Sequence, residues 1–210
     1  MNIILLNNNI VNIMNIMNYK YIFPKIIGVD YSKLKLSTEG AYSITRLHEG
    51  KQIADIVKRY VCSVNNLTLT DGTVGCGGDV IHIGNLFNSV IGIEKNYENY
   101  LCAKNNFSVL GVECELLNLD IIKYMKNNKC DVLWLDPPWG GKDYYTHDNL
   151  ELYLSKINIK KLISTWIDKC GIIFVKIPKN YNMYHIEDRF IKFDILNFKG
   201  EISFLLLMFY

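Results

Sequence analysis

The sequence predicts one α/β domain built on a largely parallel β-sheet, and three observations lead to that fold class. Short apolar runs alternate with stretches whose apolar residues recur at helical spacing, as expected for successive strand–helix units. Residues 132–135 are apolar without interruption, which is typical of a strand covered on both faces. Residues 189–210 form two β-rich runs around Lys199-Gly200, which indicates an antiparallel hairpin that closes the sheet.

The predicted elements follow one another in a regular order. A helix is expected at about 47–60, where apolar residues lie at helical spacing: Ile53, Ile56, Val57 and Tyr60. After it come a strand in NLTLT, a glycine-rich turn that opens a helix, a strand in SVIGIE, a helix at about 96–110, a strand in ECELLNLD, a short helix through Met125 and a strand in CDVLWLD. A helix near 158–168 then leads to a strand in GIIFVKIP. With the hairpin, the sheet has seven strands.

Length and composition bound the domain organisation. The chain of 210 residues suits one domain with a sizeable core, and we expect an N-terminal extension, partly helical, over 1–42 and the main domain over 43–210. Half of the residues are hydrophobic and no apolar run is long enough to span a membrane, so we expect no membrane partner. We also expect a monomer. The net charge of +2 gives little bulk attraction to nucleic acid, so an RNA or DNA partner needs a local basic patch.

The six cysteines are scattered without a C-x-x-C pair. This pattern predicts neither a metal site nor a disulfide framework, and it favours a reducing compartment inside a cell. The sequence does not distinguish the nucleus, the cytoplasm and a viral factory.

Acidic residues end the first four predicted strands of the sheet: Asp71, Glu94, Asp120 and Asp136. In a parallel sheet, ligands bind outside the carboxyl ends of the strands, so four such acids indicate a binding site. The turn after the first strand contains Gly75 and Gly77, which let the backbone approach a ligand closely. Two simpler interpretations stay open: the glycines form a tight connection only, and Asp120 caps the following helix.

This layout resembles the class I S-adenosylmethionine-dependent methyltransferases over roughly residues 43–210. The resemblance implies a Rossmann-like fold and S-adenosylmethionine as the methyl donor. It also implies that Asp71, Gly75 and Gly77 lie against the methionine part of the donor, that Glu94 holds the ribose and that Asp120 contacts the adenine.

The fourth strand ends in Asp136-Pro137-Pro138-Trp139. This tetrad resembles a motif found in methyltransferases that act on an exocyclic base amine. The motif is an acid or amide followed by two prolines and an aromatic residue. Such an amine is a poor nucleophile, because its lone pair is delocalised into the ring. Asp136 and the Pro137 carbonyl would accept its N–H hydrogen bonds and orient the lone pair, while Trp139 stacks on the base. A rigid surface turn with an aromatic lid is the simpler interpretation.

The longer run DPPWGGKDY resembles the motif of the trimethylguanosine synthases, which methylate the N2 amine of a 7-methylguanosine RNA cap. A 7-methylguanine ring is positively charged, and tryptophan is the strongest cation–π partner among side chains. The segment LSTEGAYSITRLHEG is similar to the run before the first strand in that family, although Arg46 stands where proline is usual. The match implies that Ser43 and Thr45 lie near the carboxylate end of the donor, and a plain helix-capping role for either residue stays open. Lys179 matches a basic position that would contact the cap.

These resemblances imply an RNA cap guanine-N2 methyltransferase whose partner is 7-methylguanosine-capped RNA or a cap analogue. An adenine-N6 or guanine-N2 methyltransferase for ribosomal RNA, transfer RNA or DNA shares most of the motifs. A non-catalytic protein that binds caps or nucleotides is a third possibility, against which the intact acids argue.

Overall fold

The computed structural model describes residues 11–12, 19–61, 66–186 and 189–210. Its central feature is a seven-stranded sheet in the order β10-β11-β9-β6-β3-β4-β5, within these described residues. The strands of that sheet are β3 Thr68–Asp71, β4 Ser89–Ile93, β5 Glu115–Leu117, β6 Cys130–Leu135, β9 Cys170–Ile177, β10 Phe190–Leu196 and β11 Ile202–Phe209. Five of them are parallel, and β11 pairs antiparallel with both β9 and β10. The predicted fold class is confirmed.

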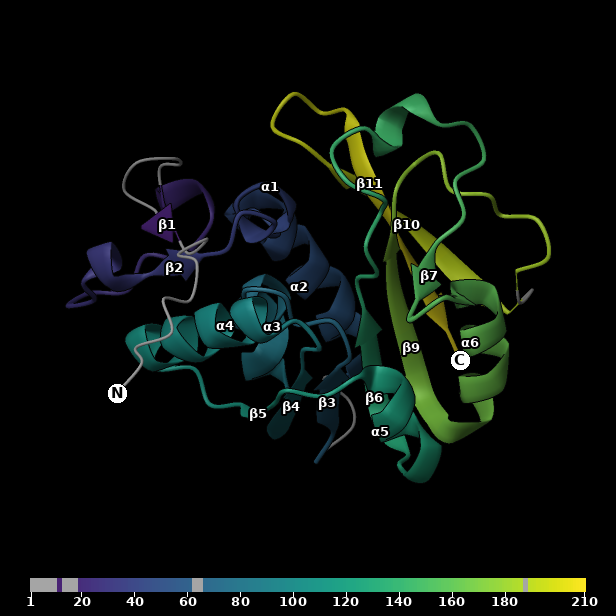
Figure 1. Cartoon of the computed structure of the whole chain (residues 1–210), viewed down its shortest axis with the longest axis horizontal. Coiled ribbons are helices and arrows are strands. Elements are labelled where there is room, and N and C mark those ends of the chain that lie inside the picture. The colour runs from purple at the N-terminus through teal and green to yellow at the C-terminus, as the bar shows by residue number, and fades with distance from the viewer. Residues whose placement is uncertain (1–10, 13–18, 62–65, 187–188) are drawn as a thin grey trace, which may run out of the picture.

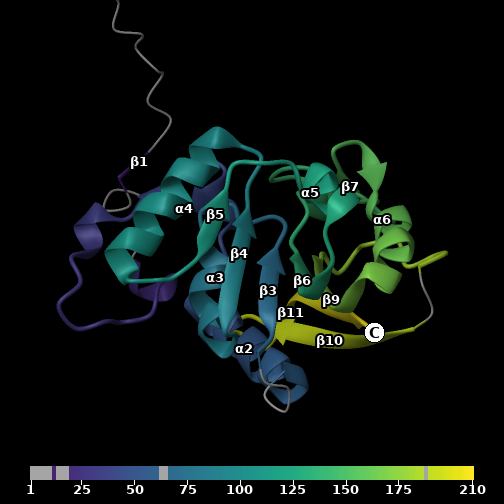
Figure 2. The same ribbon diagram turned by 90° about the horizontal axis from the view of Figure 1, so that it is seen from below.

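Helices cover both faces of the sheet (Figures 1 and 2). They are α1 Gly40–Ser43, α2 Leu47–Val61, α3 Gly78–Ile83, α4 Tyr97–Leu110, α5 Ile121–Asn127 and α6 Ile159–Trp166. Short 3-10 helices add single turns: η2 Tyr19–Tyr21, η3 Tyr31–Lys33, η4 Gly84–Leu86, η5 Tyr144–Thr146 and η6 Ile167–Lys169.

Alternation along the strands creates two apolar cores, one on each face. In β6, Val132 and Trp134 join a core with α2, α3 and α4, whereas Leu133 and Leu135 join a core with α5 and α6. Because both faces are covered, the strand reads as an unbroken apolar run, as the sequence indicated. Trp134 is fully buried, as is expected for a core residue.

The N-terminal extension packs against the main body rather than standing apart from it. Ile22, Phe23, Leu34 and Leu36 form a third apolar cluster with Cys102 and Leu110 of α4. The described part of the extension combines single helical turns with strand pairing between β1 Val11–Asn12 and β2 Lys35–Leu36. Residues 1–10 and 13–18 of the expected extension lie outside the described residues.

The strand order places the site. The chain moves outward from β3 to β4 and β5, and then returns to place β6 on the other side of β3. Such a reversal opens a crevice between the carboxyl ends of the two central strands, where ligands of doubly wound folds bind. A small hairpin, β7 Tyr153–Leu154 with β8 Ile157–Asn158, lies beyond it. In the described part of the chain, no helix is long and apolar enough to cross a membrane.

Candidate active site

A cavity of about 930 Å³ opens at the carboxyl ends of the central strands. Its wall combines the turn after β3, the ends of β4 and β6, the segment around α1 and the start of β11. Ligand pockets commonly measure roughly 300–1,000 Å³, so the cavity lies at the upper end of that range. Of the ten residues that the sequence singled out, seven line it: Thr45, Gly75, Glu94, Asp120, Asp136, Pro137 and Trp139.

The glycine-rich turn has the backbone geometry that its sequence predicts. Gly75 and Gly77 have φ angles of +56° and +96°, in the left-handed region that favours glycine. A Cβ on Gly77 would lie 2.6 Å from the Phe107 ring of α4, while a Cβ on Gly75 would meet nothing within 4 Å. Gly75 therefore faces the cavity, whereas Gly77 lies behind it and sets the packing of α4.

Glu94 links the turn to the end of β4. Its Oε2 accepts the Gly75 N–H at 2.7 Å, and its Oε1 accepts the Asn96 N–H at 2.6 Å. Burial raises the pKa of Glu94, although these two hydrogen bonds oppose the rise. The carboxylate is thus held in place at the cavity wall, with lone pairs left for a ligand hydroxyl.

Asp120 caps the helix that follows β5, which is one of the interpretations that the sequence left open. Its Oδ1 accepts the Ile122 N–H at 2.9 Å as the N-cap of α5, while its Oδ2 pairs with Lys95 at 3.0 Å and with Ser155. Burial raises the pKa of Asp120, but the hydrogen bonds from Ser155 and Lys95 outweigh it and lower the pKa overall. Asp120 caps a helix and also lines the cavity.

Asp71 lies behind the turn and does not line the cavity. Its Oδ1 accepts the Thr73 N–H at 2.9 Å, and its Oδ2 is buried without a partner among the described residues. Burial raises the pKa of Asp71 well above its usual range, and the charge of Asp79 adds to the rise. The role of Asp71 in this structure is to shape the turn.

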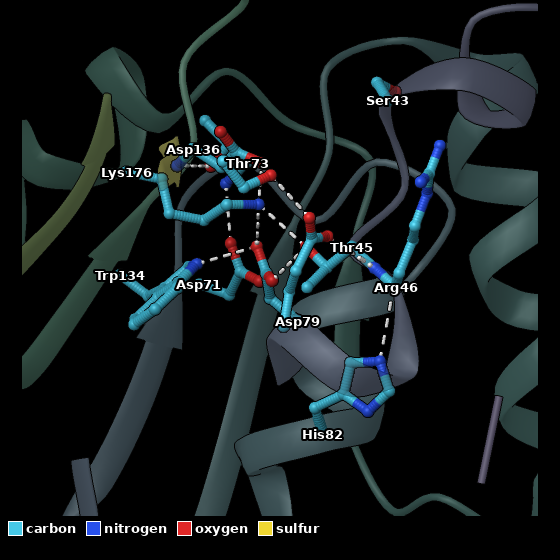
Figure 3. Close-up of polar contacts among 12 residues, drawn as sticks. Ser43, Thr45, Arg46, Asp71, Thr73, Asp79, His82, Trp134, Asp136 and Lys176 are labelled. Carbon is cyan, nitrogen blue, oxygen red and sulfur yellow. Dashed lines mark hydrogen bonds and ion pairs between the residues drawn. The ribbon is translucent and has the colours of Figure 1, made fainter. Parts of the chain in front are cut away.

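The end of β6 carries a buried polar network (Figure 3). Lys176 of β9 donates from Nζ to Asp136 Oδ2 at 2.5 Å and to Thr45 Oγ1 at 2.7 Å. It also pairs with Asp79 Oδ2 at 3.4 Å. Asp79 accepts hydrogen bonds from the Thr45 hydroxyl at 2.5 Å and from Trp134 Nε1 at 2.9 Å. These contacts tie the α1–α2 segment, α3 and two strands to a single ammonium group.

The charges in this network are unbalanced, with more acids than cations. Burial raises the pKa of Asp136 to about 6. The positive charge of Lys176 lowers this pKa, whereas the negative charge of Asp79 raises it. Burial lowers the pKa of Lys176, but the charges of Asp136 and Asp79 outweigh this and raise it above its usual value. Lys176 therefore carries its charge at neutral pH and favours the ionised form of Asp136.

Trp139 forms an aromatic wall next to Asp136. Its indole packs edge-on against Tyr144, with ring centroids 5.0 Å apart, and against Phe204 at 6.0 Å. Its Nε1 is buried without a hydrogen-bond partner in the described structure. Pro137, buried beside it, completes a rigid turn whose backbone also lines the cavity. Trp139 and Asp136 both line the cavity, three residues apart in the same turn.

The structure also brings together residues that the sequence did not single out. Lys176, Asp79 and Glu49 all line the cavity, and Lys176 and Asp79 belong to its buried network. A lysine inside the apolar run GIIFVKIP is a usable signal, because a charge in a buried strand requires partners. Lys179, in contrast, is exposed and lies outside the cavity lining, so the structure does not bring it to the site. The described residues contain no cluster of three or more His, Cys, Asp or Glu side chains suited to a metal ion.

Known structures share this fold. A 16S rRNA N2 methyltransferase of T. thermophilus, in complex with AdoMet and guanosine, superposes with a TM-score of 0.62 at 11% identity, covering 88% of this chain and 48% of that chain. A methyltransferase of unassigned activity from Porphyromonas gingivalis W83 gives a TM-score of 0.61 at 16% identity, covering 86% and 44%. The fold, with its cavity at the switch point, is that of the class I methyltransferases.

The family is narrower than the fold. A family model described as RNA cap guanine-N2 methyltransferase matches residues 66–203, and the chain belongs to that family. It is 25% identical to the trimethylguanosine synthase of Saccharomyces cerevisiae over 79% of this chain, and spans 54% of the yeast protein. It is 26% identical to protein L320 of Acanthamoeba polyphaga mimivirus, covering 87% of this chain and 81% of that protein.

Proposed function

We propose that this protein transfers a methyl group from S-adenosylmethionine to the N2 amine of a 7-methylguanosine RNA cap. The observation that carries the proposal is the pairing of the Trp139 indole with the Asp136 carboxylate on one wall of the cavity. A positively charged 7-methylguanine gains cation–π attraction from an indole that an uncharged base does not gain. The match to the cap guanine-N2 family supports the same substrate.

The donor would occupy the part of the cavity between the glycine-rich turn and the end of β5. Gly75 gives the backbone room to approach the methionine part, Glu94 accepts hydrogen bonds from the ribose and Asp120 faces the adenine. Gly77 and Asp71 act indirectly, since they shape the turn from behind. S-adenosylmethionine supplies a methyl group on a sulfonium and leaves as a neutral thioether. The acidic lining suits this cationic centre.

Asp136 and Pro137 would position the acceptor amine. Lys176 occupies Oδ2 of Asp136, so Oδ1 is the oxygen that accepts an amine N–H, and the Pro137 carbonyl accepts the second. Two such hydrogen bonds aim the nitrogen lone pair at the methyl carbon. The N–C bond forms as the C–S bond breaks, and the methylated amine then loses a proton to solvent. The rate comes chiefly from this alignment.

Thr45 would act through the network rather than on the donor carboxylate. It is only 4% exposed, and its hydroxyl is bonded to both Asp79 and Lys176. This arrangement supports a positioning role for Thr45. Lys179 is exposed and lies outside the cavity lining, so a contact with the cap phosphates would be made outside the cavity.

The test is methyl transfer to parallel acceptors: a 7-methylguanosine cap dinucleotide, its unmethylated counterpart, uncapped RNA and a ribosomal RNA fragment. We expect transfer to the first acceptor and not to the others, because only its base carries the positive charge that Trp139 favours. Transfer to the ribosomal fragment alone would identify the protein as a guanine-N2 or adenine-N6 methyltransferase of ribosomal RNA. Transfer to none, with donor binding intact, would favour a non-catalytic binding protein.

The Trp139→Ala variant adds a second arm to this assay. Stacking on an aromatic side chain contributes about 1–3 kcal/mol, so kcat/KM for the cap dinucleotide should fall about 5- to 150-fold. Donor affinity, measured by calorimetric titration, should stay within about twofold because the donor contacts come from other strands. Equal losses of donor binding and of transfer would make Trp139 a structural residue.

A further inference from the structure

Three aromatic side chains from distant parts of the chain meet outside the cavity. His48 of α2 stacks on Phe198, with ring centroids 4.5 Å apart and an interplanar angle of 26°, and Tyr21 meets Phe198 edge-on at 6.3 Å. Phe198 is 64% exposed and Tyr21 is 50% exposed. We call these three residues the aromatic platform. A gathering of exposed rings differs from the scattered single apolar residues of ordinary surfaces.

The platform is held rigidly in place by the hairpin of β10 and β11. Leu196 donates its N–H to Gln52 Oε1 at 3.0 Å and accepts from Gln52 Nε2 at 2.8 Å, which fastens the hairpin to α2. At the hairpin tip, Asn197 Oδ1 accepts the Glu201 N–H at 3.1 Å. Phe198 therefore lies on a hydrogen-bonded turn that presents its ring to solvent.

The platform continues the wall of the cavity. Asn197, which precedes Phe198, lines the cavity, and so does Arg46, which lies two residues before His48. The tip of the hairpin lies at the same edge of the molecule as α1 (Figure 1). The Arg46 side chain extends away from the buried network, toward Ser43 (Figure 3). A chain that leaves the cavity on this side meets the aromatic rings next.

Cations surround the rings. Lys20 Nζ lies 5.5 Å from the centroid of the Tyr21 ring. Lys199 follows Phe198 at the exposed hairpin tip, and Lys51 lies one helical turn after His48. Exposed aromatic rings with interspersed cations form the surface by which proteins bind single-stranded nucleic acid without reading its sequence. With three lysines against the exposed Glu201 at the hairpin tip, the patch carries a local excess of positive charge.

We propose that the aromatic platform of Tyr21, His48 and Phe198 binds the first nucleotides that follow the cap of a single-stranded RNA acceptor. Bases stack on the exposed rings, and Lys20, Lys51 and Lys199 neutralise phosphates along the same path. This inference rests on the proposed function for the direction in which the acceptor leaves the cavity. The platform should add affinity for capped RNA without altering the chemistry at the methyl group.

The test compares two acceptors, a 7-methylguanosine cap dinucleotide and a capped oligonucleotide of about ten nucleotides, within the ~4–16 that single-strand sites cover. For the native protein we expect a lower KM with the oligonucleotide. The Phe198→Ala variant should raise that KM about fivefold or more, the lower end of one lost stacking contact. Its KM for the dinucleotide should stay unchanged. Tyr184→Ala, at a tyrosine that is 77% exposed and outside the cavity lining, is the matched control and should change neither value.

A binding measurement separates this inference from the proposed function. Fluorescence anisotropy with a labelled, uncapped oligonucleotide reports the platform directly, and Phe198→Ala should weaken that binding by a similar factor. If the dinucleotide is not methylated while Phe198→Ala still weakens oligonucleotide binding, the cap assignment fails and the platform stands. If the native protein shows no preference for the longer acceptor and Phe198→Ala leaves oligonucleotide binding unchanged, the platform is not an RNA site.

Discussion

At the scale of single residues, a buried lysine sets the charge at the candidate catalytic centre. Lys176 is 2% exposed, and its ammonium group contacts Asp136, Asp79 and Thr45. Removing one partner of a buried charge pair is costly, because the remaining charge is left without compensation. Lys176 thus links the stability of the network to the protonation of the residue that would hold the acceptor amine.

A Lys176→Met variant should shift the pH dependence of methyl transfer. Burial raises the pKa of Asp136 to about 6, so its ionised form prevails above that pH in the native protein. Without the Lys176 charge the pKa rises further, and the acidic limb of the kcat/KM profile should move to higher pH. The variant should therefore recover activity in alkaline buffer.

Lys176→Arg is the matched control, because it keeps the positive charge. Its acidic limb should stay near that of the native protein, even if the larger guanidinium lowers the rate. If Lys176→Met lowers the rate equally at every pH, Lys176 only supports the structure.

The sequence predicted the acids of the site better than their partners. Glu94, Asp120 and Asp136 stand at strand ends, a position readable from pattern alone, and all three line the cavity. Lys176 and Asp79 meet only after β9 pairs with β6 and α3 packs on the face of the sheet. Their spacing in the sequence therefore does not indicate the contact. Lys179 was chosen by resemblance, and the structure leaves it outside the cavity.

At the scale of elements, the turn from β3 to α3 shows how a backbone conformation creates a site. Gly77 adopts a φ of +96° beneath Phe107, and Gly75 presents its N–H to Glu94. The order of strands and helices was predictable because each element is long enough to show its period. The β7–β8 hairpin was not, since two-residue strands are too short for alternation to appear.

A Gly77→Ala variant should lose about 2–4 kcal/mol of unfolding free energy, which combines left-handed strain with overpacking against Phe107. Gly111→Ala is the matched control. Gly111 has a φ of +67°, and a Cβ there would meet nothing within 4 Å, so the strain alone should cost about 1–2 kcal/mol. Urea denaturation measures both. Equal losses would show that Phe107 adjusts freely and that the close packing has no energetic weight.

At the scale of the whole molecule, the Asp136–Trp139 turn lines the cavity at the carboxyl ends of the strands, and the tip of the β10–β11 hairpin lies at the same edge as α1 (Figure 1). The parallel strands direct their carboxyl ends to that edge, and β10, parallel to β9 through β11, brings the hairpin tip there too. The sequence indicated the sheet and its hairpin. It did not indicate the platform, because Tyr21, His48 and Phe198 belong to segments whose meeting depends on the complete fold.

The most direct measurement is the position of the transferred methyl group. A 7-methylguanosine cap dinucleotide is incubated with the protein and labelled S-adenosylmethionine, then digested, and the nucleosides are identified by mass spectrometry. A cap with 7-methylinosine, which lacks the N2 amine, is run beside it. We predict label in N2,7-dimethylguanosine and none with the inosine cap. Label on the second nucleoside, or equal label with the inosine cap, would contradict the role given to Asp136, Pro137 and Trp139.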